Sequence, residues 1–452
     1  MTKRAAAIEK PAALLYNITA DKLPGERPRF GKMKQEIIMA KLKGAAVFGQ
    51  SGGPTSVINS SAAGVFLTAL KSGCITKVYG AANGIRGILD GKLYDIGCED
   101  EKELFYLKNT PSSALGSVRY KLADAAEDET DYKRLLEVFK QFNIRYFFYN
   151  GGNDSMDTCN KVSKYMQKAG YECRVMGVPK TIDNDLYGTD HCPGFGSAAK
   201  YIATSLMEVY QDARVYDKGS IMVVEIMGRN AGWLTGASAL AAMKGAGPDL
   251  IYLPELPFDR EKFLEDAAKI ARANNGNCMI AASEGIKYAD GRYVADSGKR
   301  DKFGHAQLGG VATALGEMLR EAIPEYRVRT IELSLLQRCA SHCGSKTDVE
   351  EAFEAGKTAV EMAVAGKTDF CVGFERTTGK NGEYGCEMKL IPLSEIANTE
   401  KKVPREWINE EGNFVNEKFI EYALPLIQGE AEYPREDGLP RFARLKKVIA
   451  EA

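Results

Sequence analysis

The sequence lacks long apolar runs, an excess of either charge, and all but three histidines. No run of about 18 apolar residues occurs, so we expect no transmembrane helix and no membrane partner. The N-terminus has no continuous apolar stretch with a cleavage site, so we expect no signal peptide. Because 60 Lys+Arg oppose 61 Asp+Glu, the chain lacks the overall basic field that non-specific nucleic-acid binding requires.

The ten cysteines are scattered and form no disulfide framework, so we expect a reducing cytoplasmic compartment. Cys339, His342 and Cys343 have a spacing that some metal sites use. No second ligand cluster accompanies them, and we interpret this segment as a buried helix. The other histidines, His191 and His305, show no metal spacing, and we assign no role to any of the three.

Short apolar runs recur along the chain, separated by helical stretches. Strands without polar alternation indicate a parallel sheet covered on both faces, which is an α/β fold. Ligands of such folds bind beyond the carboxyl ends of the strands. We predict strands at 45–49, 77–82, 145–150, 174–178, 221–227, 250–253 and 278–282, helices at 55–71, 155–170 and 197–216, and a hairpin or loop at 377–387.

Glycine pairs follow two of the predicted strands. Gly52 and Gly53 follow the first, and the segment 151–155 follows the aromatic strand RYFFYN. Glycines before a helix let backbone N–H groups approach an anion. A plain turn would explain the first motif alone, and a helix cap by Asp154 would explain the second alone. Together they favour a polyphosphate site with a magnesium ligand beside it.

A third strand runs into Pro-Lys-Thr-Ile-Asp-Asn-Asp, residues 179–185. In an extended segment Asp183 and Asp185 point to the same side. One carboxylate can then hold Mg²⁺ while the other accepts a proton from an attacking hydroxyl, which is what phosphoryl transfer requires. The alternative is a surface Asx turn, which does not need the adjacent Lys180 and Thr181.

Several other charged residues suit a phosphorylated substrate. Arg229 and Glu284 follow predicted strands, Arg119 follows the segment 116–118, and Arg329 and Arg338 flank the apolar run 330–337. Two nucleotide-like motifs lack the required context. The segment 194–199 matches GxGxxA but follows a loop, which weakens the alternative of a nicotinamide-linked dehydrogenase. The segment 366–368 resembles the end of a P-loop, but Glu361 stands where the first glycine belongs.

Taken together, these motifs resemble the phosphofructokinase family over roughly residues 44–400. The segments that carry the resemblance are SGGPTSVIN, GSVR, GGNDS, PKTIDND, MGRNAG, SEG and LLQR, in the family's order. The resemblance implies two similar Rossmann-like doubly wound domains with the active site between them. We place a phosphoryl-donor domain at 43–194 plus about 338–390, a sugar-phosphate domain at 195–337, an N-terminal extension at 1–42 and a C-terminal segment at 391–452.

The resemblance also implies magnesium-dependent transfer of a phosphoryl group to the 1-hydroxyl of fructose 6-phosphate. It makes Asp183 the base, with Lys180, Asp154, Thr181 and Arg119 as further catalytic residues. One arginine of the family often reaches in from a neighbouring subunit, which implies a homo-oligomer, a dimer or a tetramer. The implied contacts are Gly52, Gly53, Arg119 and Asp154 for the donor; Thr181, Ile182, Asp183, Met227, Gly228, Arg229, Glu284, Arg329 and Arg338 for the sugar phosphate; and Asn153 and Asp185 for the metal.

The phosphoryl donor depends on two positions. ATP-using members resemble one another in having Gly where this chain has Asp154 and Lys180. Asp154 would occupy space and repel a nucleotide's α-phosphate, whereas Lys180 adds positive charge beside a small leaving anion. We therefore predict pyrophosphate as the donor and a reaction that runs both ways, serving glycolysis and gluconeogenesis. The alternatives are ATP as the donor, or an inactive regulatory subunit.

Three positions depart from the family pattern. Asn153 replaces the usual Asp, so that a magnesium ligand is neutral or Asp154 takes its place. Ser220 stands where ATP-dependent members carry an arginine that crosses to another subunit, and Lys218 lies two residues earlier. Leu335 stands where many members have His, so that part of the sugar-phosphate contact moves elsewhere.

Overall fold

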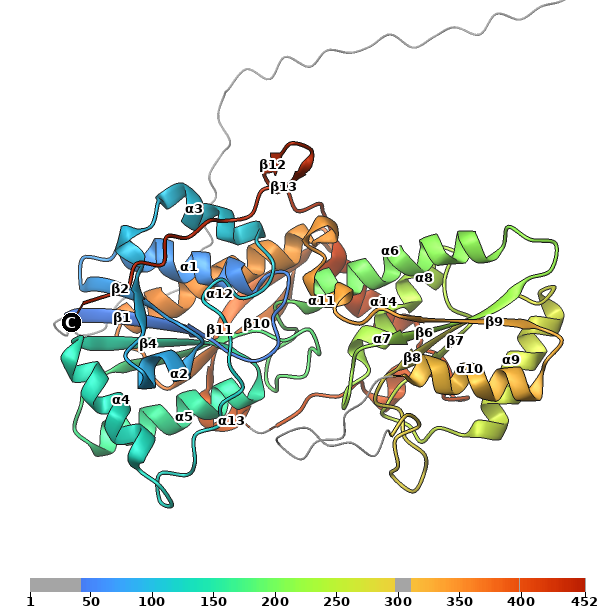
Figure 1. The fold of residues 1–452 in the computed structure, drawn as a ribbon, viewed down its shortest axis with the longest axis horizontal. Coiled ribbons are helices and arrows are strands. Elements are labelled where there is room, and N and C mark those ends of the chain that lie inside the picture. The colour runs from blue at the N-terminus through green and yellow to red at the C-terminus, as the bar shows by residue number, and fades with distance from the viewer. Residues whose placement is uncertain (1–41, 297–309, 398, 452) are drawn as a thin grey trace, which may run out of the picture. The chain divides into compact units, whose positions relative to one another are not determined.

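The computed structural model describes residues 42–296, 310–397 and 399–451. The predicted N-terminal extension therefore lies, apart from its last residue, outside the described residues. In the part of the chain that the structure describes, no helix combines the length and the apolar character needed to cross a membrane. The α/β fold predicted from the sequence is confirmed: two sheets built mainly of parallel strands are covered by helices (Figure 1).

The first sheet has seven strands in the order β11-β10-β5-β4-β1-β2-β3. Its central strands β1, β2, β4 and β5 are parallel, whereas β3 and β11 run antiparallel to their neighbours. All seven residues of β1 are buried, because helices cover both faces. The strands are β1 (Gly44–Gln50), β2 (Ile75–Ala81), β3 (Leu93–Asp95), β4 (Ile144–Gly151), β5 (Arg174–Pro179), β10 (Phe370–Thr378) and β11 (Tyr384–Pro392).

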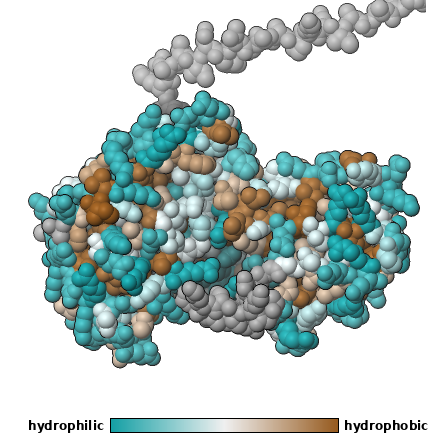
Figure 2. All heavy atoms as spheres, viewed as in Figure 1, coloured by the Kyte–Doolittle hydropathy of each residue, from teal (hydrophilic) through white to brown (hydrophobic). Residues whose placement is uncertain are grey.

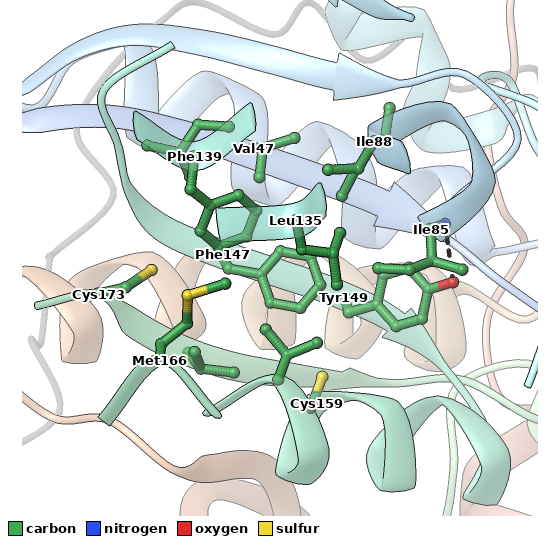
Figure 3. Packing of buried hydrophobic residues seen from close by; sticks show 14 of the residues in the cluster. Val47, Ile85, Ile88, Leu135, Phe139, Phe147, Tyr149, Cys159, Met166 and Cys173 are labelled. Atoms are coloured by element: carbon green, nitrogen blue, oxygen red, sulfur yellow. Dashed lines mark hydrogen bonds between the residues drawn. The ribbon is translucent and has the colours of Figure 1, made fainter. Parts of the chain in front are cut away.

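One face of this sheet packs against α4 (Thr130–Gln141) and α5 (Asn153–Lys168). Figure 3 shows this cluster, in which side chains of β1 and β4 meet those of the two helices. The opposite face packs against α1 (Ile58–Leu70) and α12 (Lys346–Val364). These two helices approach so closely that a Cβ on Gly64 would lie 2.1 Å from the carbonyl oxygen of Phe353.

The second sheet has four parallel strands in the order β7-β8-β6-β9. These strands are β6 (Ser220–Ile226), β7 (Leu250–Tyr252), β8 (Cys278–Ser283) and β9 (Arg327–Glu332). Helices α6 (Phe195–Ala213), α7 (Trp233–Ala237) and α14 (Glu417–Ala423) contribute to the core on one face. Helices α9 (Arg260–Ala273) and α10 (Val311–Ala322) contribute to the core on the other.

The C-terminal segment touches both sheets. Residue 400 bridges to Leu186, α14 packs on the second sheet, and Ile449 pairs with Tyr94 of β3. The predicted hairpin at 377–387 is the turn between β10 and β11. The remaining elements are short: α2 (Ile85–Leu89), α3 (Glu101–Tyr106), α8 (Ala239–Ala242), α11 (Leu336–Cys339), α13 (Leu393–Ile396), β12 (Arg435–Glu436), β13 (Leu439–Pro440) and five 3-10 turns.

Candidate active site

The two predicted phosphate-binding turns and the predicted carboxylate segment 179–185 follow adjacent strands of the first sheet. Strands β1, β4 and β5 are neighbours and parallel, so their carboxyl ends share one edge. Two backbone hydrogen bonds link the turns that follow: Ser51 N–H donates to the Asn150 carbonyl at 2.9 Å, and Lys180 N–H donates to the Gly151 carbonyl at 3.1 Å. The sheet order thus brings the three motifs together at one edge.

The first glycine turn, residues 51–53, packs closely against two cationic side chains. Gly52 has φ +76°, a conformation that glycine adopts readily, and Ser117 Oγ donates to its carbonyl at 2.6 Å. Lys180 Nζ donates to the Gly53 carbonyl at 2.7 Å. A Cβ on Gly53 would lie 3.2 Å from Nη1 of Arg338. Two cationic side chains therefore lie against this turn, where they would meet an anion bound there.

Lys180 is a buried cation, with only 3% of its surface exposed. Burial lowers its pKa to about 8, although the carboxylates of Asp183 and Asp185 partly oppose that shift. The charges of Arg338 and Arg119 lower the pKa further, which places both arginines in the neighbourhood of the ammonium. Arg119 itself is exposed, next to the segment Ser117–Val118 that hydrogen-bonds to the glycine turn.

Our expectation of an extended segment at 181–185 was wrong. The chain turns there, and Asn184 has φ +56°. Its side chain is held by Tyr422, to whose hydroxyl it donates at 2.7 Å, and by the backbone N–H of Cys192 at 2.9 Å. The left-handed residue thus lies between the two carboxylates, and Thr181 Oγ1 accepts from the Asp183 N–H at 3.1 Å.

The carboxylates of Asp183 and Asp185 nevertheless remain close enough to affect each other. Burial raises the pKa of both groups; the negative charge of Asp183 raises the pKa of Asp185 further. Three further charges shift the pKa of Asp183. Glu284, which follows a strand of the second sheet, raises it, whereas Lys180 of the first sheet and Arg229 of the second lower it. Asp183 is therefore the point at which the charges of the two sheets converge.

Asn153 and Asp185, the predicted metal ligands, are neighbours. Asn153 Nδ2 donates to Asp185 Oδ2 at 3.1 Å. The other amide atom, Asn153 Oδ1, is buried and has no hydrogen-bond partner among the described residues. An unpartnered oxygen beside a carboxylate suits Mg²⁺, which prefers oxygen ligands. Asp154, the next residue, is exposed, and the residue at the N-cap of α5 is Gly152, so Asp154 is not the helix cap.

The turn after β6 carries the predicted sugar-phosphate residues. Gly228 has φ +142°, and its N–H lies 3.5 Å from Glu284 Oε1. A Cβ on Gly285 would lie 1.9 Å from the carbonyl oxygen of Arg229, so the turns after β6 and β8 are tightly packed. The Met227 N–H donates to Gln337 Oε1 at 3.1 Å. These contacts fix the backbone that presents Arg229 and Glu284 near Asp183.

Arg329 and Arg338, predicted to grip one phosphate, have different surroundings within one chain. Arg338 lies beside Gly53, whereas Nη1 of Arg329 lies 3.8 Å from Asp212 Oδ2, in a cavity that Lys218, Ser220, Arg272 and Arg327 also line. Ile182, another predicted contact, packs its side chain into the core of the second sheet, so only its backbone could serve a ligand.

Sequence reasoning missed Glu400. It lies in the charged tail, where nothing in the sequence separates it from its neighbours. In the structure it bridges to Leu186 and accepts a hydrogen bond from Asn230 at 2.9 Å, and its charge raises the pKa of Asp183 and Asp185.

Two further sequence motifs, the GxGxxA segment 194–199 and the segment 339–343, lie at helices in the structure. At the start of α6 the N–H groups of Gly194 and Ser197 both donate to the carboxylate of Asp348 at 2.9 Å. That helix terminus is filled by the protein's own anion, so it does not present the anion site that a dinucleotide would need. Cys339 and Cys343 are only half-buried and belong to separate short helices, which corrects our expectation of one buried helix.

The fold and the site together define a doubly wound α/β protein in which charged residues that follow strands of two sheets come near one another beside a glycine-rich turn. The chain belongs to the phosphofructokinase family, which it matches over residues 45–363.

Named relatives are similar over nearly the whole chain. A pyrophosphate–fructose 6-phosphate 1-phosphotransferase of Halomonas elongata is 44% identical over 415 residues, 90% of this chain and 97% of the relative. One of Methylococcus capsulatus is 45% identical over 407 residues, 89% of this chain and 96% of the relative. The crystal structure of a pyrophosphate-dependent phosphofructokinase from Marinobacter aquaeolei is similar with a TM-score of 0.81 and 42% identity, covering 90% of this chain and 98% of that one.

Proposed function

We propose that the chain is an enzyme that transfers a phosphoryl group reversibly from pyrophosphate to the 1-hydroxyl of fructose 6-phosphate, giving fructose 1,6-bisphosphate and phosphate. The names of the relatives above support this reaction. The observation that carries the proposal is the position of Lys180, whose buried ammonium lies on the glycine turn and donates to the Gly53 carbonyl.

Lys180 makes the donor cradle small and positive. A Cβ on Gly52 would lie 3.4 Å from Lys180 Nζ, so the ammonium lies in van der Waals range of the turn's backbone. Asp154 is exposed at the start of α5, on the neighbouring turn. A bare diphosphate gains a charge-assisted hydrogen bond from Lys180, whereas a nucleotide's α-phosphate would approach the negative Asp154. This pair therefore favours pyrophosphate over ATP.

Asp183 is the residue we assign as the base. Burial raises the pKa of Asp183, whereas the positive charges of Lys180 and Arg229 lower it in part. A carboxylate that is more basic than usual accepts a hydroxyl proton more readily. Because Glu284 and Arg229 lie on the side of the second sheet, we place the sugar there, with its 1-hydroxyl toward Asp183.

We assign Asn153 Oδ1 and the carboxylate of Asp185 as the protein ligands of Mg²⁺. Bound magnesium would neutralise charge on the donor's phosphate oxygens. Asn153 is held in place by its hydrogen bond to Asp185. Lys180 and Arg338, which lie against the glycine turn, and Arg119, whose charge acts on Lys180, supply the remaining positive charge.

A second copy of the chain would complete the sugar-phosphate side. Arg329 lies away from Arg338, and the exposed apolar residues Val215 and Tyr216 flank its cavity, while Leu335 and Leu336 are exposed beside Arg338. Brown apolar patches interrupt the largely hydrophilic face in Figure 2. We propose a dimer or a tetramer in which Arg329 reaches a neighbour's phosphate site.

Initial rates with each donor test the proposed reaction. Wild type is expected to use pyrophosphate and to show no comparable rate with ATP, in a coupled assay for fructose 1,6-bisphosphate. The double variant Asp154→Gly/Lys180→Gly is expected to lose most of the pyrophosphate rate and to gain ATP use, with the KM for fructose 6-phosphate unchanged as the internal control. A wild-type kcat/KM for ATP equal to that for pyrophosphate would contradict the proposal.

A further inference from the structure

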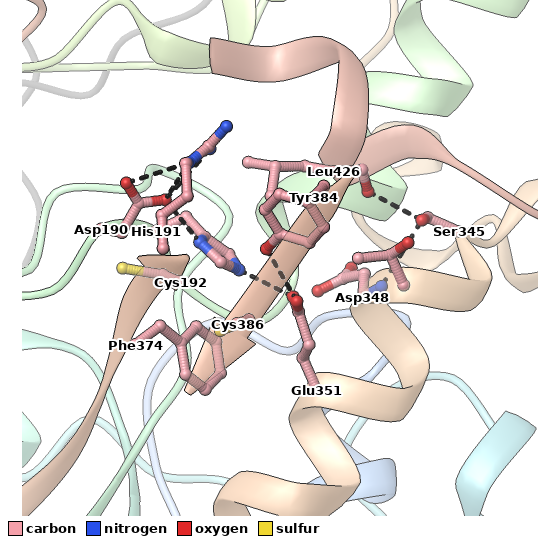
Figure 4. A network of polar contacts seen from close by, with 12 residues as sticks. Asp190, His191, Cys192, Ser345, Asp348, Glu351, Phe374, Tyr384, Cys386 and Leu426 are labelled. Carbon is pink, nitrogen blue, oxygen red and sulfur yellow. Dashed lines mark hydrogen bonds and ion pairs between the residues drawn. The ribbon is translucent and has the colours of Figure 1, made fainter. Parts of the chain in front are cut away.

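His191 lies fully buried between two carboxylates (Figure 4). Its Nδ1 lies 2.9 Å from Asp190 Oδ2, and its Nε2 lies 2.7 Å from Glu351 Oε2. Both ring nitrogens face acceptors, and an ionised carboxylate can only accept hydrogen bonds. When both carboxylates are ionised, both distances are satisfied at once only when both ring nitrogens carry protons, as in the imidazolium.

The groups around His191 are arranged to keep that charge. The guanidinium of Arg376 pairs with the carboxylate of Asp190 through both Nε and Nη2, and Tyr384 OH donates to Glu351 Oε1 at 2.7 Å. Burial alone would lower the pKa of His191, but its hydrogen bonds to the two carboxylates outweigh burial and raise it. Among the described residues, the charged or titratable groups at this cluster are Asp348 and Glu351 of α12, Arg376 of β10, Tyr384 and Cys386 of β11, Tyr422 of α14, Cys192 and Lys401.

The same cluster is joined to the segment that carries the two site carboxylates. Tyr422 OH donates to the Asp190 carbonyl at 2.7 Å and accepts from Asn184 Nδ2 at 2.7 Å. Asn184 is the left-handed residue between Asp183 and Asp185. The path from the imidazole to the candidate base therefore runs through two hydrogen bonds and one short stretch of backbone.

We propose that His191 is a positioning residue for the transfer reaction: held as an imidazolium, it fastens the segment 181–192 to α12 and β10 and so fixes the direction of Asp183. The proposal rests on the function proposed above, but the charge on the ring is measurable without any turnover. It gives a role to a residue to which the sequence analysis assigned none.

The cluster also contains Cys386, whose sulfur lies with His191 and Glu351 inside a 4.8 Å group. A metal ion there would have to part His191 Nε2 from Glu351 Oε2, which are already at hydrogen-bond distance. Burial raises the pKa of the Cys386 thiol, which disfavours the thiolate that a metal would need. The geometry therefore favours the ion-paired imidazolium over a metal centre.

The protonation state can be observed directly, because the chain has only three histidines. We would label the full-length protein with histidine carrying ¹³C at Cε1 and follow the three signals by NMR between pH 6 and 9, assigning them with His305→Gln and His342→Gln. The His191 signal is expected to stay at the imidazolium position at pH 7, above the ordinary pKa of about 6.5. A neutral His191 ring at pH 7 would overturn the proposal.

The kinetic test removes one carboxylate and leaves the base untouched. In Glu351→Gln the pKa of His191 should fall by about one unit or more, because an opposite charge at contact distance is lost. As pH rises, the ring then loses its proton earlier, so the alkaline fall in kcat should move to lower pH by the same amount. The matched control is Glu350→Gln, an exposed neighbour on α12 that faces Lys346, and its profile should not move.

The kcat profile is used because it reports the enzyme–substrate complex, in which Lys180 faces bound pyrophosphate and remains charged. A Glu351→Gln profile that coincides with wild type would overturn the positioning role, as would a shift that does not coincide with the NMR titration of His191. Stoichiometric zinc in the purified wild type that disappears in Cys386→Ser would overturn it as well. If the chain showed no transferase activity, the function would fail while the NMR result still stood.

Discussion

The two sheets contribute to the site in different ways. On the first sheet, three adjacent strands end at one edge, and backbone hydrogen bonds such as that from Lys180 to Gly151 tie their turns together. On the second sheet, tightly packed turns hold Arg229 and Glu284. Arg329 of β9 lies instead near Asp212 of α6. The residues that we assign to the donor side lie together within one chain, whereas we propose that a second copy completes the sugar-phosphate side.

Because the two sheets differ in this way, substitutions on them should change different kinetic constants. A pre-arranged cluster of charge that meets the reacting phosphoryl group contributes mainly to the transition state, and its loss lowers kcat. A group that only holds a remote phosphate contributes to substrate binding, and its loss raises KM. The first-sheet residues should therefore behave differently from Arg329 in kinetics.

The largest expected effect belongs to Asp183→Asn. Without a base the hydroxyl keeps its proton in the transition state, so kcat should fall by roughly 10²–10⁴-fold, while the KM for fructose 6-phosphate changes little. Asp212→Asn, an exposed carboxylate near Arg329, serves as the control for a lost charge. Retention of more than about a tenth of the wild-type kcat would remove Asp183 from the base role.

The next effect belongs to Lys180→Met, which keeps a long side chain but removes the charge. The kcat/KM for pyrophosphate should fall about 100-fold, because a charge-assisted hydrogen bond contributes about 1.5–3 kcal/mol and the burial of Lys180 strengthens it. In wild type the same constant should decline as pH rises through about 8, where the free ammonium loses its proton. A wild-type profile that stays flat to pH 9 would contradict the assignment.

Much of the fold could be predicted because its inner strands are short apolar runs. The strands predicted at 45–49, 145–150 and 278–282 are β1, β4 and β8. β9 was missed, since its sequence RVRTIE has neither a continuous apolar run nor a strict alternation of polar and apolar residues, and only one of its six residues is buried. The helix predicted from 55 begins at Ile58, because Thr55 Oγ1 accepts from the Val57 N–H and keeps the chain in a turn.

The site was predictable where it depends on local motifs at one sheet edge, and unpredictable where it depends on distant partners. The turn at Asn184 is held by Tyr422, which lies 238 residues further along the chain. Glu400 reaches the carboxylates only because its segment pairs with Leu186. The sequence indicated no role for His191, since its partner Glu351 is 160 residues away. Spacing along a chain does not report such contacts.

A smaller effect is expected from Arg329→Ala on the second sheet. We expect the KM for fructose 6-phosphate to rise about 10–100-fold with kcat and the KM for pyrophosphate nearly unchanged, since one charged hydrogen bond is lost. Mixed oligomers of Arg329→Ala and Arg338→Ala should recover part of the wild-type affinity if the two arginines meet across subunits. The control is Arg272→Ala in the same cavity. If Arg329→Ala and Arg272→Ala raise the KM for fructose 6-phosphate equally, the effect comes from the positive potential of the cavity and not from a specific contact of Arg329.

The smallest expected effect concerns the metal. Asn153→Asp places a second carboxylate beside Asp185 and should tighten the apparent Mg²⁺ affinity about two- to five-fold, the size of a partly screened charge contact, whereas Asn153→Ala should weaken it. The added negative charge also raises the pKa of the neighbouring carboxyls, so the gain should shrink as pH falls. Calorimetric titration with Mg²⁺ alone measures the affinity of each variant and its pH dependence, and the Mg²⁺ dependence of the rate gives the matching kinetic value. If the two substitutions leave the affinity unchanged, the unpartnered Asn153 Oδ1 is not a ligand, and Asp185 must hold the ion without it.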